Sequence, residues 1–384
     1  MLELLSLASC VLLSLSFCYV AVAIMGVLRF GLKLRSAPKS DGLAPVTLLK
    51  PLCGMEPGLA DNLRSFCNQD YETFQIVFGV RDRKDPAVPV IKDIIEGFPQ
   101  LDLSLVVDDR IIGTNYKVSN LANMMSAAKH DIVVVSDSDM RVRRDYLKIV
   151  TAPFADDNVG ATTCLYSGSA SDGMPSKLGA MYINDWFLPS ALLPTMFVPL
   201  NYCFGATMAV RRGVLEGMGG FDALADYLAD DYMLGQFVAD QGYRIALAPY
   251  VVDNVISEPD LKGLFQHELR WARTIRSVQP VGYTLSFITE LLPLSLLAAL
   301  PVSLFTGSAL PAVAIICCAL GMRAAMHYAV SYAVPGNTLF APWLIPVRDL
   351  ISTAVRIVSY FSSRVLWRES AFEIHANNQL KIAK

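Results

Sequence analysis

Asp137 and Asp139 end the apolar run "VVVSDSDMRV" (133–142), with Ser138 between them. No lysine or arginine separates the two carboxylates, and side chains two residues apart on an extended strand project to the same side. Their repulsion predicts a bound cation, and oxygen ligands suit Mg²⁺ or Mn²⁺. Such an ion usually completes its shell with substrate phosphates. The alternative is a solvated turn whose carboxylates pair with the arginines that follow it, Arg141, Arg143 and Arg144.

A second acidic pair, Asp230 and Asp231, opens the predicted helix "DYMLGQFVADQG" (231–242). Acidic side chains are stabilised at a helix N-terminus, so capping accounts for one of them. The other would project elsewhere and be free to act as a general base.

Basic residues recur in "QHELRWARTIRSV" (266–278), where Arg270, Arg273 and Arg276 would share one helix face. Two roles stay open for Arg273 and Arg276: contact with lipid phosphates at a membrane surface, or binding of a diphosphate leaving group. For Arg270 we favour the second. Lys117 follows "GTNY" (113–116) and opens a predicted helix.

The elements that must position these residues alternate between strands and helices. Continuous β-branched runs between helical stretches predict βαβ units, a parallel sheet and a doubly wound α/β fold. Ligands of such sheets bind beyond the carboxyl ends of the strands, where Asp82, Asp108 and Asp137 all lie. The predicted strands are 44–52, 74–80, 101–109, 131–139 and 159–168, the last that the pattern indicates, and the predicted helices are 57–70, 85–98 and 117–129.

Long apolar segments flank this alternating region. Residues 4–28 carry no charge, which is long enough for a membrane span, and the acidic start argues against a signal peptide. Basic residues follow at once, which predicts a cytoplasmic location for the next domain. Residues 285–305 and 309–330 are also long enough to span. The segment 343–367 contains charges and would be a span, a re-entrant segment or a surface-lying helix.

Two further features leave alternatives open. The basic tail favours a cytoplasmic C-terminus, which two spans after the soluble domain would give and three would not. The apolar segment 181–200 would either lie in the membrane surface and admit a lipid or form a core helix with a broken end. The expected domains are therefore an anchor (1–30), a cytoplasmic catalytic domain (40–280), membrane or interfacial helices (281–367) and a tail (368–384).

Composition narrows the class of protein. The chain has 384 residues, of which 53% are hydrophobic and 17% charged, and its net charge of -3 gives no indication of nucleic-acid binding. The eight cysteines include no CxxC pair, so we expect neither a metal cluster nor a disulfide framework.

Several motifs in order resemble the ceramide glucosyltransferase family and its bacterial relatives associated with hopanoid lipids. The similarity runs from about residue 46 to about residue 280. Its motifs are "LKPLCGMEPGLADNLRSF", "IVFGVRDRKDPA", "NYKVSNL", "SDSDM", "FGATMAVRR", "GGFDALADYLADDY" and "HELRWARTIR". The family pattern has three aspartates and an (R/Q)xxRW box. The aspartates fall on Asp82, Asp137 and Asp231, and the box on Arg270 and Trp271, with His267 as a departure at its first position.

The resemblance implies a membrane enzyme of the nucleotide-sugar glycosyltransferase A type, placed in a bacterial inner membrane. It would transfer a hexosyl group from a UDP-sugar to a hydroxyl of a membrane lipid and invert the anomeric carbon. Glucose with ceramide is the first expectation, and N-acetylglucosamine with a hopanoid lipid is the alternative.

The same resemblance assigns roles to individual residues. Asp82 would contact the uracil or ribose, Asp137 and Asp139 would hold Mn²⁺ or Mg²⁺, and Asp231 would be the general base. Arg270 would steady the leaving group and Trp271 would offer a flat face to the acceptor or sugar. Lys117 would either bind the nucleotide-sugar donor or be a solvated helix start. The residues left to the acceptor or leaving-group region are Asp230, His267 and Arg273.

Other activities fit the pattern less well. A processive polysaccharide synthase shares the aspartates, but generally has more spans and a glutamine where His267 stands. A polyprenyl-phosphate sugar transferase is not expected to carry "HELRW". A non-catalytic lipid-binding protein would not need the full set of aspartates.

Overall fold

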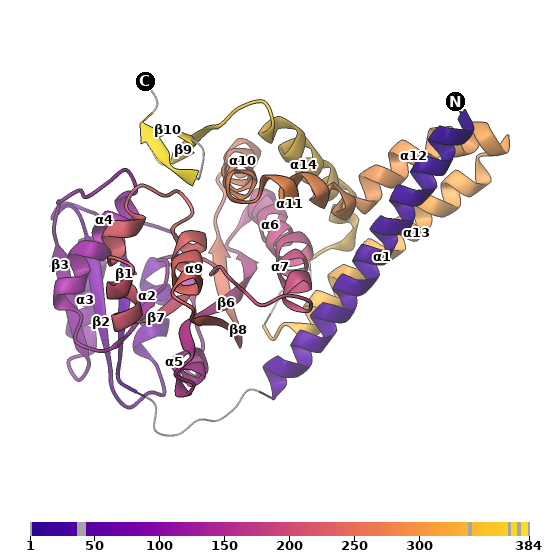
Figure 1. Cartoon of the computed structure of the whole chain (residues 1–384). Helices are drawn as coiled ribbons and strands as arrows, with labels where there is room; N and C mark the ends of the chain where they lie inside the picture. The colour runs from indigo at the N-terminus through magenta and orange to yellow at the C-terminus, as the bar shows by residue number, and fades with distance from the viewer. Residues whose placement is uncertain (1, 37–43, 337–339, 368–369, 375–377, 383–384) are drawn as a thin grey trace. The chain divides into compact units, whose positions relative to one another are not determined.

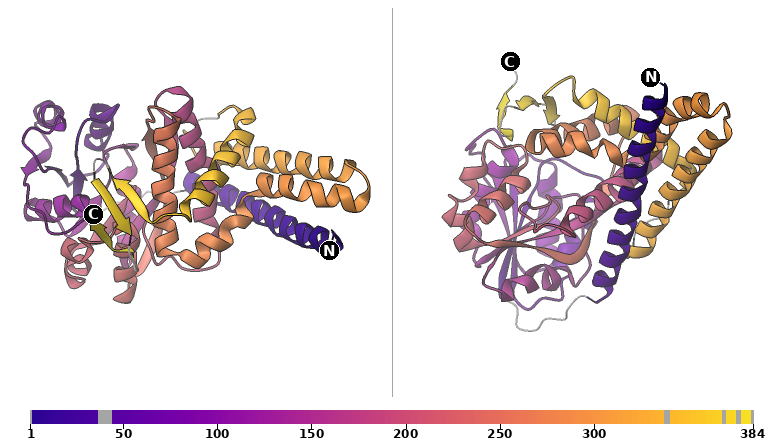
Figure 2. Two further views of the ribbon diagram at one scale, coloured as in Figure 1. Left: turned by 90° about the horizontal axis from the view of Figure 1, so that it is seen from above. Right: turned by 45° about the vertical axis from the view of Figure 1, so that its right-hand side comes forward.

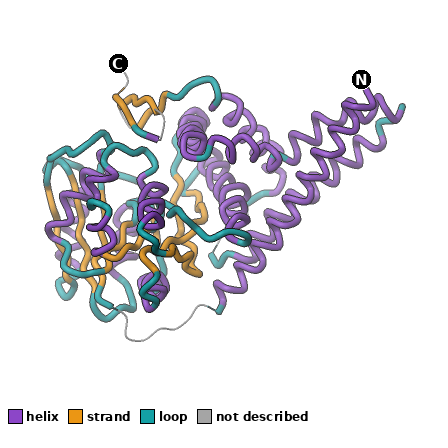
Figure 3. The backbone as a smooth tube through the Cα atoms, in the orientation of Figure 1, coloured by secondary structure: helices purple, strands orange, loops and turns teal. Residues whose placement is uncertain are grey.

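A computed structural model describes residues 2–36, 44–336, 340–367, 370–374 and 378–382. The chain forms two compact units, each built from segments distant in sequence. The sheet unit comprises Ser36–Ser167, Val198–Ser257 and Trp367–Lys384. The helical unit comprises Met1–Arg35, Gly168–Phe197 and Glu258–Leu366. Figure 1 and Figure 3 show strands surrounded by helices in the first unit and long helices in the second.

The sheet unit contains an eight-stranded sheet in the order β3-β2-β1-β4-β7-β6-β8-β5. Strand β1 pairs in parallel with β2 and β4, and β2 pairs in parallel with β3. Strand β7 is antiparallel to β4 and β6, and β5 is antiparallel to β8. The strands are β1 (Val46–Pro51), β2 (Phe74–Val80), β3 (Asp102–Val107), β4 (Ile132–Val135), β5 (Met140–Arg141), β6 (Val159–Ala170), β7 (Met208–Arg211) and β8 (Arg244–Ile256).

Helices cover both faces of this sheet, because neighbouring strand residues point to opposite sides. Leu48 and Phe78 pack into a core beneath α2 (Leu59–Cys67), α3 (Ala87–Gly97) and α5 (Tyr146–Thr151). Leu49 and Val77 pack into a second core beneath α4 (Tyr116–Met124), α8 (Arg212–Gly217) and α9 (Asp230–Asp240). This arrangement confirms the doubly wound α/β class.

The helical unit is made largely of α-helices. Its short elements include the π-helix η3 (Ile183–Phe187) and the 3₁₀ turn η5 (Ser286–Thr289). The α-helices are α1 (Leu2–Arg35), α6 (Gly173–Tyr182), α7 (Leu188–Thr195), α10 (Leu261–Val278), α11 (Pro280–Leu285), α12 (Leu291–Thr306), α13 (Leu310–Ala333) and α14 (Ile345–Ser359).

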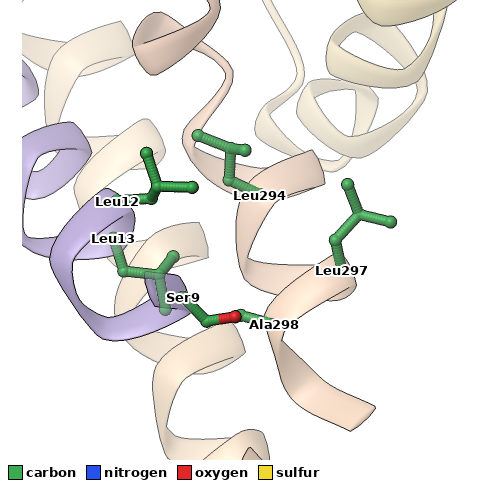
Figure 4. A pocket seen from close by; sticks show the side chains of 6 residues that line it. All are labelled: Ser9, Leu12, Leu13, Leu294, Leu297 and Ala298. Carbon is green, nitrogen blue, oxygen red and sulfur yellow. The ribbon is translucent and has the colours of Figure 1, made fainter. Parts of the chain in front are cut away.

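Helices α1, α12 and α13 run alongside one another (Figure 2). Small residues allow this approach: a Cβ atom added at Gly31 would lie 2.7 Å from the Cβ of Ala333. The Ser16 hydroxyl donates to the carbonyl of Ile288 at 2.6 Å. Figure 4 shows the small pocket between α1 and α12, lined by Ser9, Leu12, Leu13, Leu294, Leu297 and Ala298.

Within the described residues, two helices are long and apolar enough to cross a membrane, Glu3–Arg35 and Leu310–Ala333. The span expected at 285–305 is instead a pair, Pro280–Thr289 and Leu291–Thr306, bent by 65°. The pair makes a third candidate if it acts as one span.

Helix α14 occupies the segment whose membrane status the sequence left open. At about 1.5 Å per residue its 15 residues reach about 22 Å, short of the roughly 30 Å of a bilayer core. Arg348, Asp349 and Arg356 are buried, whereas Val347 and Leu350 are exposed. The charges therefore face protein, and this helix is too short to be a straight span.

Candidate functional site

The carboxyl ends of the parallel strands are level, which gathers the loops that follow them. Leu49 of β1 is paired with Val77 of β2 and with Val135 of β4. Beyond Val135 the chain turns, and the Met140 amide donates to the carbonyl of Asp137 at 3.4 Å. The extended strand through 139 that we predicted is therefore wrong. The turn, rather than strand alternation, sets the directions of Asp137 and Asp139.

Lys117 joins the two acidic clusters. Its Nζ lies 2.7 Å from Oδ1 of Asp137 and 3.5 Å from Oδ2 of Asp230, and its side chain is 19% exposed. The solvated helix start considered above is thus wrong. No lysine or arginine separates Asp137 from Asp139 in the sequence, but Asp137 has a cationic partner, which comes from α4, distant in sequence. The arginines proposed for that role contact Asn62, Asp145 and Asp70 instead.

Lys50 is a buried cation of the same site that the sequence analysis missed. Its Nζ donates to the backbone carbonyl of Asp137 and lies 3.7 Å from the centroid of the Phe66 ring. The residue is fully buried. Burial lowers the pKa of Lys50 to about 7, against the opposing pull of Asp137 and Asp139. A lysine inside the apolar strand "TLLKPL" (47–52) was the available signal.

Asp139 is half-buried in a carboxylate-rich environment. The Asn254 amide donates to its Oδ2 at 3.0 Å, and Ser138 donates to Oε2 of Glu56 at 2.7 Å. Burial first, and then the charges of Asp137 and Glu56, raise the pKa of Asp139 to about 7. Neither Glu56 nor Asn254 was predicted from the sequence.

Asp230 and Asp231 lie inside the first turn of α9, whose N-cap is Ala229. The prediction that one of them is the N-cap residue is wrong. Asp230 is directed to Lys117, while Oδ1 of Asp231 accepts from the amide of Tyr232 at 2.8 Å. Burial first, and then Asp230, raise the pKa of Asp231 to about 7. A carboxyl with this pKa suits proton transfer near neutral pH.

The space beside Asp231 depends on a glycine. A Cβ atom added at Gly205 would lie 3.1 Å from Oδ2 of Asp231. The Tyr202 and Tyr232 rings stack nearby, with centroids 5.6 Å apart. Because glycine has no Cβ, Oδ2 of Asp231 stays uncrowded. Gly205 lies in the "FGATMAVRR" motif.

Asp82 follows β2, two strands from β4 in the sheet. It is exposed, and its Oδ1 accepts from the amide of Lys84 at 2.9 Å. The structure thus joins Asp137, Lys117 and Asp230 by direct contacts and leaves Asp82 at the same sheet edge in a separate turn.

The acidic cluster fits a divalent cation only if the protein supplies part of the ion's ligands and other molecules supply the rest. Within the described residues, no group of three or more His, Cys, Asp or Glu side chains is arranged to hold a metal ion. Asp137 and Asp139 offer hard oxygen donors, and the charges of Asp137 and Glu56 add to the effect of burial in raising the pKa of Asp139. This donor set matches an ion that takes its remaining ligands from phosphate and water.

The predicted box lies on α10 of the helical unit. Nδ1 of His267 is 2.7 Å from Oε1 of Glu258, and its ring centroid is 4.2 Å from that of Trp271. Burial lowers the pKa of His267. Trp271 is stacked on Tyr182 at 5.8 Å, with 17° between the ring planes. Part of the aromatic surface that we assigned to the acceptor therefore contacts protein.

The arginines of α10 differ in their contacts. Arg273 donates to the carbonyl of Arg364, and Arg276 donates to the carbonyl of Ser362 at 3.0 Å. Both side chains thus hold the segment that follows α14. Arg270 is half-buried on the same helix.

Comparison with known proteins places this arrangement in a family. Residues 8–380 match glycosyl transferase family 21, and the chain belongs to that family. Ceramide glucosyltransferase 3 of Caenorhabditis elegans is 22% identical over 95% of this chain and 80% of its own length. Ceramide glucosyltransferase 1 of the same organism is 20% identical over 100% of this chain and 82% of its own length.

A solved structure supports the fold. A mannosyltransferase from Pyrobaculum calidifontis, in complex with GDP-Man and Mn²⁺, has a TM-score of 0.51 at 20% identity. The likeness covers 93% of this chain and 99% of the other. The chain is therefore a glycosyltransferase with a fold of the nucleotide-sugar glycosyltransferase A type.

Proposed function

We propose that the chain transfers glucose from UDP-glucose to a hydroxyl of ceramide, with inversion at the anomeric carbon. The observation that carries the proposal is the half-buried Asp231, whose pKa is raised to about 7, beside the Lys117–Asp137 pair. The names of the family relatives supply the sugar and the lipid.

The reaction is a single displacement. The lipid hydroxyl oxygen attacks the anomeric carbon, the bond from that carbon to the UDP oxygen breaks, and Asp231 accepts the hydroxyl proton. Attack from the face opposite to UDP inverts the configuration. Asp230 holds Lys117 toward the site, and Lys117 places positive charge where the diphosphate of the donor would lie.

Asp137 and Asp139 would hold a divalent cation, Mn²⁺ or Mg²⁺. When bound, the ion neutralises charge that develops on the departing diphosphate. Without it, Lys117 neutralises Asp137 and so limits repulsion of an incoming nucleotide. Asp82 contacts the uracil or ribose in this proposal, and Arg270 contacts the diphosphate.

The acceptor makes a membrane location necessary. Helix α1 ends in Arg29, Lys33 and Arg35, which the positive-inside rule assigns to the cytoplasmic side. UDP-sugars would then reach the sheet unit from the cytoplasm. Trp271 and His267 face the acceptor region in this scheme, and the bacterial inner membrane is its location.

One assay tests the proposal. The purified full-length protein is incubated with radiolabelled UDP-glucose, UDP-N-acetylglucosamine or GDP-Man, with Mn²⁺, and with ceramide or a hopanoid lipid. We expect label in a monoglycosylated ceramide from UDP-glucose. Label in the hopanoid, in long polymer, or in water alone would replace this function by hopanoid glycosylation, polysaccharide synthesis or non-catalytic lipid binding.

A further inference from the structure

A C-terminal hairpin packs against the loop that carries the predicted base. Strands β10 (Ser370–Ile374) and β11 (Leu380–Ile382) pair in antiparallel register, with Phe372 opposite Ile382. Phe372 and Leu380 are each 2% exposed. The hairpin is part of a three-stranded sheet in the order β11-β10-β9, in which β9 is Arg364–Trp367. Strands β10 and β11 belong to the sheet unit.

Its principal contact is a segment that we call the base loop, residues 225–229, which leads directly into Asp230 and Asp231. The Leu228 amide donates to the carbonyl of Asn378 at 3.1 Å, and the Leu380 amide donates to the carbonyl of Asp226 at 2.8 Å. Between these bonds, Tyr227 and Gln379 form an antiparallel bridge. The hairpin thus extends a short β ladder onto the base loop.

The base loop is also tied to the start of α4, which carries Lys117. The amide of Thr114 donates to Oδ1 of Asp226 at 2.9 Å, and Nδ2 of Asn115 donates to the carbonyl of Tyr227 at 2.8 Å. The same asparagine caps α4 by accepting from the amide of Val118. Thr114 also donates to the carbonyl of Leu380 at 3.4 Å, so hairpin, base loop and helix start form one bonded group.

A ring contact extends this group toward Asp82, the residue predicted to contact the nucleotide. The Phe372 ring meets the Tyr116 ring edge-on, with centroids 6.3 Å apart, and Arg81 lies 4.4 Å above the Tyr116 ring. Tyr116 is the neighbour of Lys117, and Arg81 is the neighbour of Asp82. The hairpin therefore contacts the segments that present Lys117 and Asp231, and it reaches the segment of Asp82 only through the Tyr116 ring.

We propose that the C-terminal hairpin is a positioning element of the transfer reaction, in which Asn378 and Leu380 hold the base loop and thereby set the placement of Asp231. Neither residue touches substrate. This inference rests on the proposed function for the role of Asp231. The contact between hairpin and base loop can be measured independently of that role.

Asn378 allows a sharp test, because its φ of 63° lies in the left-handed region. Glycine adopts this conformation freely, whereas a β-branched residue strongly resists it. Asn378→Gly should keep the backbone that presents the carbonyl to Leu228, and Asn378→Val should move it. Lys381→Ala, at an exposed position of β11, serves as the matched control.

We expect kcat of Asn378→Val to fall about tenfold, with the donor KM within about twofold of the parent. Asn378→Gly and Lys381→Ala should match the parent. Hydrogen exchange on the full-length proteins should be faster at 226–230 in Asn378→Val alone, with exchange across β1, β2 and β4 unchanged. If Asn378→Val does not accumulate, a chain ending at residue 377 carries the test with the same expectations.

The inference is overturned if exchange at 226–230 is unchanged in Asn378→Val or if its kcat matches the parent. A loss of donor affinity and of whole-unit protection together would also overturn it, since that indicates general destabilisation. A parent that transfers no sugar from any donor would contradict the proposed function. Faster exchange confined to 226–230 would still support the contact between hairpin and base loop.

Discussion

Buried charges are arranged differently in the two units. In the helical unit three of the buried carboxylates each face an arginine: Arg348 binds Glu268 through two bonds of 2.7 Å, and Arg323 binds Asp349 at 2.9 and 2.7 Å. Arg356 lies 3.0 Å from Glu290. In the sheet unit, among the described residues, the carboxylates of the site outnumber the lysines Lys50 and Lys117. These carboxylates belong to Glu56, Asp137, Asp139, Asp230 and Asp231.

The difference distinguishes charged residues that hold the fold together from charged residues that bind substrate or take part in the reaction. A buried bidentate pair fixes the relative register of two helices and leaves little capacity for a ligand. Half-buried carboxylates that outnumber the nearby cations raise one another's pKa values and attract cations, which is the pattern of a site prepared for a charged substrate. On this basis the helical unit's network orients α10, and the sheet unit's network performs chemistry.

The largest expected effect comes from breaking one of the buried arginine–carboxylate pairs of the helical unit. Arg348→Met leaves Glu268, which is 0% exposed, without its partner, and should lower the free energy of unfolding by about 3–5 kcal/mol. Adding Glu268→Leu should restore most of the loss, because both charges are then absent. Thermal unfolding of the full-length protein in detergent measures both values. A double variant no more stable than Arg348→Met would contradict the assignment of this pair as purely structural.

The next effect concerns the site of the sheet unit, in which carboxylates outnumber lysines. Asp231→Asn keeps the shape of the side chain but removes the proton acceptor, so kcat should fall by about 10² to 10⁴ while UDP-sugar affinity stays near the parent value. Single-turnover kinetics and equilibrium binding of the donor distinguish the two quantities. Asp240→Asn, at the exposed far end of α9, is the control. Near-normal turnover in Asp231→Asn would remove this residue as the base.

A smaller effect is expected from the candidate metal ligand. Asp137→Ala should weaken donor binding in Mn²⁺ by at least about tenfold, and change it little in EDTA. Isothermal titration with UDP-glucose under both conditions tests this. Asp61→Ala, whose side chain is 72% exposed on α2, should match the parent. Donor binding and turnover in the parent that are indifferent to metal would end the hypothesis that Asp137 and Asp139 hold an ion.

The sequence predicted the parallel half of the sheet well and the antiparallel half poorly. Strand β2 was predicted at its observed bounds, because a continuous β-branched run leaves little choice of register. Strand β7 has only four residues, and β8 contains Pro249 and Asp253, so neither gave an uninterrupted apolar run. Periodicity detects strands buried on both faces and misses short or polar ones.

The candidate site was predicted in part for a related reason. Its aspartates follow strand ends, which the sequence displays directly. Pairings between distant segments, such as Lys117 with Asp137, depend on how α4 packs over the sheet. Lys50 was visible in the sequence as a charge in a core strand, but its direction toward Asp137 follows only from the three-dimensional register.

The smallest expected effect tests why the pKa of Asp231 is raised. With the pKa of Asp231 raised to about 7, the base is protonated at low pH, so kcat/KM should fall about tenfold per pH unit below 7 and level off above it. Asp230 is the second cause of this increase, after burial. Asp230→Asn removes a neighbouring negative charge and so favours ionisation of Asp231. The acidic limb of the pH profile of kcat/KM should therefore shift to lower pH by up to about one unit. Asp240→Asn should leave the limb in place. A limb that stays fixed in Asp230→Asn, or moves to higher pH, would mean that the excess of carboxylates does not tune the base.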